Sequence, residues 1–264
     1  MSSPKTLLLS AVSLTCLAFV VAPAVANSDI QRHCNHPDFT KSARIFDAVQ
    51  ICATADVSAA KLKHAANVAA QWLDNDQDGK VDDAQLREII EENKATLVMT
   101  NEWMDEERSE MFMEHFDEHV SQDLGGIETN PTDARDASQE ELHHLIVNSG
   151  WVLYEPEIFS DEPEENSELY NIWLKAEKEG YYSYDDPTCN AACKVTEFFY
   201  LATAAYLNSQ ADLFSDEMRI KTREGLEEKL PTIIEIMEDD AFTYPLKMWP
   251  DGKYAHSKNV LISE

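Results

Sequence analysis

Aspartates alternate with other residues in one short polar segment, at Asp74, Asp76 and Asp78, and Gly79 follows directly. A hard, oxygen-seeking cation such as Ca²⁺ is bound by carboxylates at this spacing, with a glycine at the sharp turn of an EF-hand-type loop. The remaining donors at ligand positions are the backbone carbonyl of Lys80 and the side chains of Asp82 and Gln85. The sequence therefore predicts a calcium site over residues 74–85.

The last ligand position of this loop departs from the usual pattern. Gln85 stands where an EF-hand loop normally has a bidentate glutamate. A neutral ligand with one oxygen lowers both the charge and the coordination number, so we expect a dissociation constant of about 0.1 to 1 mM. No second loop of this type follows, which favours a structural site over a sensor. The alternative is an acidic turn that binds no ion.

A second group of residues has the spacing of a metallopeptidase helix. In the zincin pattern His-Glu-x-x-His, the two histidines bind zinc and the glutamate activates water. Here Glu140 replaces the first histidine, Glu141 is the candidate general base, and His144 is the second ligand. Glu197, in the middle of an apolar segment, is the candidate third ligand, because a buried carboxylate is costly without a partner. The alternative is that Glu141 only caps its helix and that Glu197 pairs with a buried histidine or tyrosine.

A third pattern, His115-x-x-Glu-His119, matches the inverted zincin motif. The glycines and apolar residues that accompany such a motif are missing around it. A solvated helix face is therefore the favoured interpretation.

Four segments together carry a resemblance to known proteins: Asn67 to Gly79, Gln122 to Leu124, Glu140 to His144, and Cys193 to Tyr200. They resemble a group of exported proteins with one calcium-type loop near the N terminus. Their C-terminal part is similar to the third-ligand helix of gluzincin metallopeptidases. The resemblance covers most of the chain and implies calcium together with zinc or another divalent transition metal. It implies no established activity.

Helical periodicity dominates the chain. Apolar residues recur at helical spacing over residues 58–73 and 83–93, on either side of the aspartate-rich loop. Further helices are predicted over residues 101–120, 138–150, 167–178, 191–207, 215–230 and 231–237. The sequence predicts a mainly α fold, a single compact helical domain over residues 27–264. Its parts are an EF-hand-type unit (58–94), a zincin-like part (135–264) and a small C-terminal hairpin at Pro250 to Gly252.

The N terminus and the cysteines indicate export. One lysine, an apolar run and the small residues Ala24 to Ala26 form a secretory signal peptide over residues 1–26. The four cysteines that follow are expected to form disulfides, with local pairing favoured: Cys34 with Cys52 and Cys189 with Cys193. A metal site that combines thiolates with His33 or His36 is the alternative. We expect a secreted or periplasmic protein.

The charge of the chain limits its partners. The formal net charge is −29, which repels nucleic acid and anionic membrane surfaces and attracts divalent cations. No segment after residue 26 is long and apolar enough for a membrane span. Two classes of function remain: a calcium-dependent protein that binds an extracellular protein or peptide, and a metallopeptidase-like hydrolase.

Overall fold

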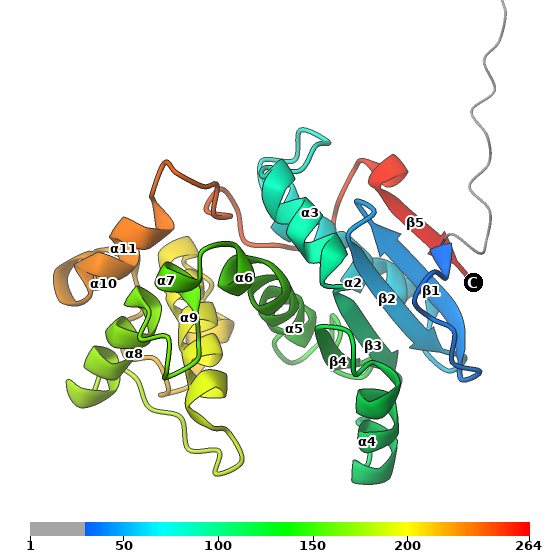
Figure 1. The fold of residues 1–264 in the computed structure, drawn as a ribbon, viewed down its shortest axis with the longest axis horizontal. Coiled ribbons are helices and arrows are strands. Elements are labelled where there is room, and N and C mark those ends of the chain that lie inside the picture. Colours follow the sequence, from blue (N-terminus) through cyan, green and yellow to red (C-terminus); the bar gives the residue numbers. More distant parts are fainter. Residues whose placement is uncertain (1–29) are drawn as a thin grey trace, which may run out of the picture.

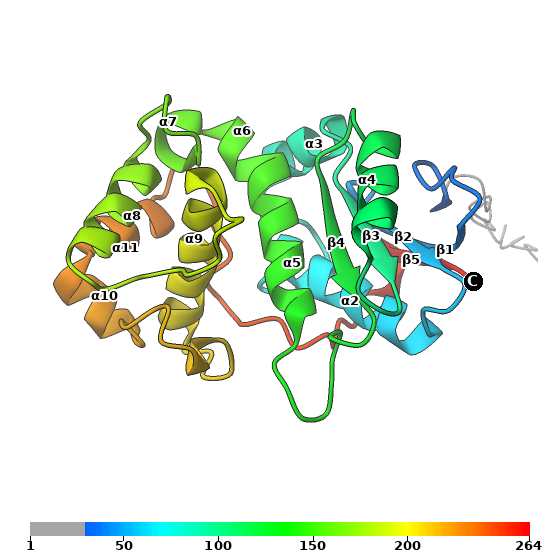
Figure 2. The same cartoon turned by 90° about the horizontal axis from the view of Figure 1, so that it is seen from below.

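The chain builds a β-sheet at one end and a group of helices at the other (Figure 1). The computed structural model describes residues 30–264. The predicted signal peptide, residues 1–26, lies outside the described residues. One helix, α5 (Ala137–Ile146), lies between the sheet and the helical group (Figures 1 and 2).

The sheet has five strands in the order β4-β3-β2-β1-β5. The strands are β1 (Phe39–Ile45), β2 (Val49–Thr54), β3 (Thr96–Thr100), β4 (Ser121–Gly125) and β5 (Val260–Ser263). Strands β2, β3 and β4 run parallel, whereas β1 is antiparallel to both β2 and β5. The protein is therefore an α/β protein, and the prediction of a mainly α fold is wrong.

The strands were not predicted because they are short and because the two central ones, β2 and β3, are wholly buried. All six residues of β2 and all five of β3 are buried, so neither strand shows the polar and apolar alternation that marks a half-exposed strand. The predicted C-terminal hairpin is also wrong. The turn at Pro250 to Gly252 leads instead to β5, which pairs with β1 near the other end of the chain.

Each face of the sheet has its own cover. Helices α2 (Ala59–Leu73) and α5 pack on the face that contributes Ala43, Ile51 and Leu97 to the main core. Helix α4 (Glu106–His115) and the segment before β1 cover the other face, where a smaller apolar cluster forms. This cluster comprises Cys34, Phe39, Cys52, Val98, Phe112 and Phe116.

The predicted helix-loop-helix forms as expected. Helix α2 begins after the cap Ser58, whose side chain accepts a hydrogen bond from the Lys61 N–H. Helix α3 (Ala84–Glu92) begins after Asp83, whose carboxylate accepts from the N–H groups of Gln85 and Leu86. The aspartate-rich segment is the connection between these two helices.

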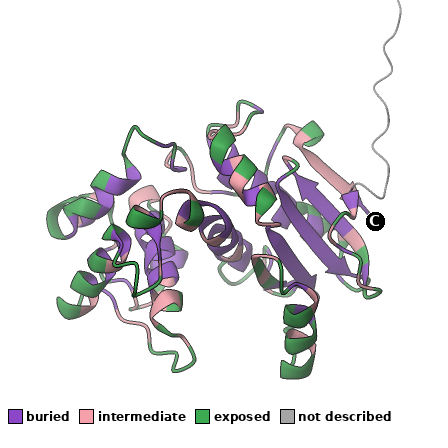
Figure 3. Cartoon of the chain, viewed as in Figure 1, coloured by how far each residue is buried: buried purple, intermediate pink, exposed green. Residues whose placement is uncertain are grey.

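Most other predicted helices are present with adjusted ends. After α5 come the π-helical turn η1 (Val147–Trp151), α6 (Val152–Tyr154), α7 (Pro156–Phe159), α8 (Glu168–Lys178), α9 (Ala191–Leu207), the short turn η2 (Asp212–Phe214), α10 (Arg223–Lys229), α11 (Pro231–Met237) and η3 (Ser257–Asn259). Helix α9 has the predicted bounds and is largely buried (Figure 3). The helix predicted over 215–230 is shorter, because Met218 forms a β-bridge with Tyr182 instead.

The described chain contains two disulfide bonds. Cys34 is bonded to Cys52, and Cys189 to Cys193, the local pairing that the sequence favoured. The first bond holds the segment before β1 against β2, and the second lies at the start of α9. Within residues 30–264, none of the helices combines the length and the apolarity that a bilayer crossing requires.

Candidate metal centres

Two groups of potential metal ligands converge within the described part of the chain. One is Asp74, Asp76 and Asp78, and the other is Glu140, His144 and Glu197. In each group, one ligand atom from every residue lies within 4.8 Å of the others. The first group lies in the loop between α2 and α3, and the second lies between α5 and α9.

Backbone hydrogen bonds fold the aspartate-rich loop around its carboxylates. Asp74, fully buried, accepts hydrogen bonds from the N–H of Asp78 at 3.0 Å and from that of Gly79 at 2.9 Å. Asp76 accepts a second bond from the Asp78 N–H at 3.0 Å. Gly79 has a φ of +90°, and a Cβ there would lie 2.8 Å from Nδ1 of His256. The glycine is therefore required both by the backbone conformation and by a close neighbour.

The C-terminal segment completes this loop. The hydroxyl of Tyr254 donates to Asp74 Oδ2, and the Asn259 amide donates to the Gly79 carbonyl at 3.0 Å. The His256 ring bonds the Gln77 carbonyl at 2.9 Å. No local sequence signal connects these residues with the loop, because they lie near the end of the chain and only the pairing of β5 with β1 brings them there.

The other predicted calcium ligands have separate roles in this structure. The Lys80 ammonium pairs with Asp78 at 2.9 Å. Asp82 Oδ2 accepts the Asn75 N–H at 2.8 Å, and burial raises the Asp82 pKa to about 6. Gln85 lies in the first turn of α3 with an exposed side chain. The structure thus brings together the first three aspartates, and the Asp82 carboxylate is not part of that group.

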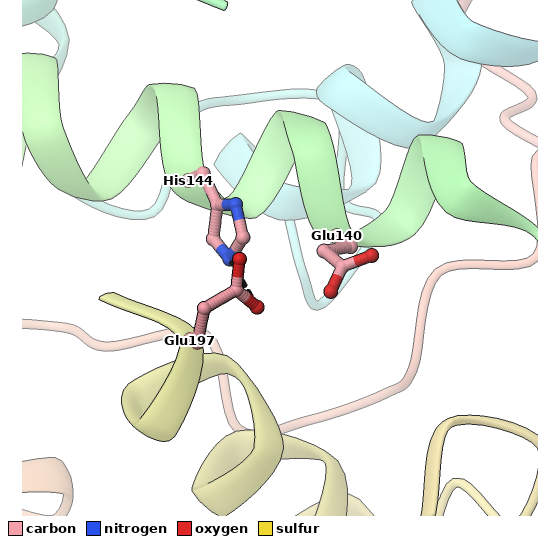
Figure 4. A group of neighbouring side chains, drawn as sticks. All are labelled: Glu140, His144 and Glu197. Carbon is pink, nitrogen blue, oxygen red and sulfur yellow. Dashed lines mark ion pairs between the residues drawn. The ribbon is translucent and has the colours of Figure 1, made fainter. Parts of the chain in front are cut away.

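The second group joins two helices. Glu140 and His144 lie one turn apart on α5, and Glu197 reaches toward them from α9 (Figure 4). The distance from His144 Nε2 to the Glu197 carboxylate is 3.8 Å, which is beyond a hydrogen bond. Nε2 is buried and has no hydrogen-bond partner among residues 30–264. An orphaned polar atom in a buried site requires an explanation, and an imidazole nitrogen facing two carboxylates fits a metal ligand.

The pKa values of Glu140, His144 and Glu197 are all raised in this group. Burial opposes protonation of His144, but the carboxylates of Glu141, Glu197 and Glu140 outweigh it and raise the His144 pKa to about 9. Burial also raises the pKa of Glu140 and that of Glu197. A dication could replace the protons that this crowded set of groups holds.

Glu141 lies on the other side of the histidine. Its carboxylate is 3.7 Å from His144 Nδ1 and accepts a hydrogen bond of 2.5 Å from Gln122 on β4. A carboxylate at the second ring nitrogen orients a metal-binding histidine and makes it more basic. Glu141 and Glu197 therefore lie at ion-pair distance from opposite nitrogens of the His144 ring.

Sequence reasoning missed Arg135, which precedes α5. Its guanidinium pairs with Glu140 and lies 3.9 Å from Asp212. Both carboxylates and Arg135 line a cavity of about 690 Å³ that also exposes Phe214. The cavity therefore gives solvent access to the Glu140 side of the group. A lone arginine in a loop carries no motif, so no sequence signal pointed to it.

The neighbouring histidine has a structural role. His143 Nε2 bonds the Tyr244 hydroxyl at 2.7 Å, and Tyr244 also bonds Thr203 at 2.7 Å. Burial and the charges of Glu197 and Glu140 raise the pKa of Tyr184 to about 12.

Comparison with known families, curated proteins and solved structures found no match. The resemblance noted from the motifs stays a prediction.

Proposed function

We propose that this protein is an exported, acidic calcium-binding protein. In this proposal, Ca²⁺ in the loop of residues 74–85 fastens the C-terminal segment onto α2 and α3. The convergence of Asp74, Asp76 and Asp78 carries the proposal. The two disulfides are typical of an oxidising compartment outside the cytoplasm.

Calcium binding and folding are expected to be coupled at this site. Three carboxylates within 4.8 Å of one another repel when no ion is present. Tyr254 and Asn259 contact the same loop, so an ion that orders the loop also holds the end of the chain. At about 10 mM calcium and a dissociation constant of about 1 mM, linkage gives about 1.4 kcal/mol of stabilisation.

Thermal unfolding with calcium and with a chelator tests the proposal. We expect a higher melting temperature in calcium, and we expect Asp76→Ala to abolish the difference. Asp240→Ala, at an exposed aspartate elsewhere, is the matched control and should keep it. Calcium should also slow tryptic cleavage after Lys253 and Lys258, which flank the contacts to the loop. Superimposable melting curves for the wild type would overturn the proposal.

The second candidate function is a metal-dependent hydrolase, possessing a centre at Glu140, His144 and Glu197. The specific observation in its favour is the unpartnered Nε2 of His144 between two carboxylates, next to a cavity that reaches Glu140. Zinc or another divalent transition metal bound there would supply Lewis acidity. With one imidazole and two carboxylates, the ligand set is harder than a histidine-rich site, so manganese and iron(II) should compete well with zinc.

Glu141 is the candidate general base in this hydrolase. Glu141 faces His144 Nδ1 at the ion-pair distance of 3.7 Å and accepts a hydrogen bond from Gln122 on β4. To act as general base it has to turn away from Nδ1 toward the cavity.

Metal analysis and a cleavage assay separate the two candidates. The hydrolase requires one ion per chain beyond calcium, lost in His144→Ala. It also requires cleavage of an unstructured protein by the wild type but not by Glu141→Gln, which should keep the ion. His143→Gln is the control, because its ring bonds Tyr244 instead of the centre. Equal metal content in the wild type and His144→Ala would remove this candidate and leave the calcium proposal intact.

A further inference from the structure

Four histidines from two distant segments meet on the sheet face that α4 covers. His33 and His36 precede β1, whereas His115 ends α4 and His119 follows it. The ring centroids of His33 and His119 are 5.1 Å apart, and those of His36 and His115 are also 5.1 Å apart. Figure 2 shows α4 beside the segment that leads into β1.

The end of α4 decides how these rings are paired. Helix α4 stops at His115, and Phe116 is its C-cap. His115 and His119 are therefore not one turn apart on a single helix, as an inverted zincin requires. Each instead meets a histidine from the segment that the disulfide of Cys34 anchors to β2.

The spacing within each pair suits two ligands of one ion. An imidazole nitrogen binds zinc at about 2.0 to 2.1 Å, which places the ring centroid about 3.2 Å from the ion. Two such rings at a tetrahedral angle have centroids about 5 Å apart. The rings of both pairs are also nearly perpendicular, at 85° and 74°.

Hydrogen bonds orient three of the rings through one nitrogen. His119 Nδ1 bonds the Thr96 hydroxyl at 2.9 Å, and His115 Nε2 bonds the Asn35 side chain at 2.8 Å. His36 Nδ1 accepts the N–H of Asp38 at 3.3 Å. Where the bonded nitrogen donates, as in His119 and His115, such bonds fix the tautomer and leave the other nitrogen as the ligand atom. His36 differs, because an accepting Nδ1 places the proton of the neutral ring on Nε2, so this long bond has to break before His36 binds an ion.

Burial also affects three of the rings. It lowers the pKa of His33 and that of His115, and it lowers the pKa of His119 to about 4. Lys94, whose charge also lowers the pKa of His119, is paired with Glu118 at 2.9 Å.

We propose that each pair, His33 with His119 and His36 with His115, supplies two imidazole ligands to a transition-metal ion such as Zn²⁺, Cu²⁺ or Ni²⁺. A cavity of about 220 Å³ lined by His33, His115 and His119 gives access to the site. Asp117 and Glu118 line the same cavity and can supply oxygen ligands. The metal class follows from the donors, because nitrogen ligands suit these ions and oxygen ligands suit Ca²⁺ and Mg²⁺.

This site is independent of the two centres described above. It lies on the α4 face of the sheet, whereas α5 packs on the opposite face. It can therefore be tested in a His144→Ala parent saturated with calcium, in which the other two centres do not take up the probe.

Zn²⁺ titration against a chromophoric chelator tests the proposal on the full mature chain. We expect the parent to bind Zn²⁺, and we expect the double variant His33→Ala/His119→Ala to bind it at least tenfold more weakly. The double variant His36→Ala/His115→Ala should show a similar loss. His64→Gln is the control, because the His64 ring pairs with Asp136 outside the cluster, and it should bind as the parent does. Unchanged affinity in both double variants would overturn the proposal.

A second measurement needs no substitution in the cluster. In the ¹⁵N-histidine spectrum of the parent, substoichiometric Cu²⁺ should broaden the imidazole signals of His33, His36, His115 and His119 before those of His64 and His256. Broadening that spares the four cluster signals would contradict the site even if the alanine variants fail to fold.

Discussion

Arg135 is expected to compete with the metal for Glu140. Its guanidinium pairs with this carboxylate and lies 3.9 Å from Asp212. The Arg135 side chain is 43% exposed, so solvent screens its charge and the effective dielectric constant around it is close to that of water. A neutral side chain at this position should therefore tighten metal binding.

The size of the effect follows from Coulomb's law. A dication about 5 Å from a guanidinium is repelled by about 1.7 kcal/mol in a water-like dielectric. Every 1.4 kcal/mol or so corresponds to a tenfold change in a dissociation constant. We expect Arg135→Met to bind the ion at least about tenfold more tightly than the wild type. Without metal, the variant should melt at a lower temperature, because Glu140 loses its partner.

Mn²⁺ is the appropriate probe, because it prefers carboxylates and discriminates against the histidine cluster. Free Mn²⁺ can be followed by electron paramagnetic resonance in calcium-saturated protein. Arg223→Met is the matched control, since Arg223 is 39% exposed and pairs with Glu238 away from the centre. It should leave the affinity unchanged.

The competition between Arg135 and the metal can be refuted separately from the metal centre itself. A folded Arg135→Met protein that binds Mn²⁺ no more tightly than the wild type would refute the competition. If the wild type itself binds no ion that depends on His144, the second metal centre is refuted instead.

Two further predictions concern stability, and a third concerns the cysteines. Gly79→Ala should destabilise the protein by about 1 to 3 kcal/mol in chemical denaturation, because of the positive φ and the contact with His256; an unchanged midpoint would contradict this. Asp136→Asn should melt below the wild type at neutral pH. Burial opposes ionisation of Asp136, but hydrogen bonds from His64 and other groups hold its pKa below the usual value. The stability from this charge is therefore present above about pH 4 and lost as the pH falls through the lower folded-state pKa, so the two melting curves should converge in acid. Thiol titration of the denatured, non-reduced mature protein should find no free thiol, since the four described cysteines are bonded.

Local features of the sequence were sufficient where the chemistry is local. The helix-loop-helix around Asp74 to Asp78 follows from caps, a glycine and helical periodicity within a few turns of chain. The bounds of α9 follow from its cap Asn190 and from Asn208, which ends the helix in a left-handed conformation. Both disulfides join cysteines close in sequence.

Only the tertiary structure decided what these elements face. The buried strands β2 and β3 show no alternating pattern, so the sequence predicted neither the sheet nor the pairing of β5 with β1. That pairing brings Tyr254 to Asp74. The spacing of Glu140 and His144 placed both on one helix face, yet whether Glu197 reached them depended on how α5 and α9 pack. Arg135 meets Glu140, and His33 meets His119, through contacts between segments that carry no mutual sequence signal. Spacing along one helix determines which side chains share a face, whereas the packing of separate elements determines which faces meet.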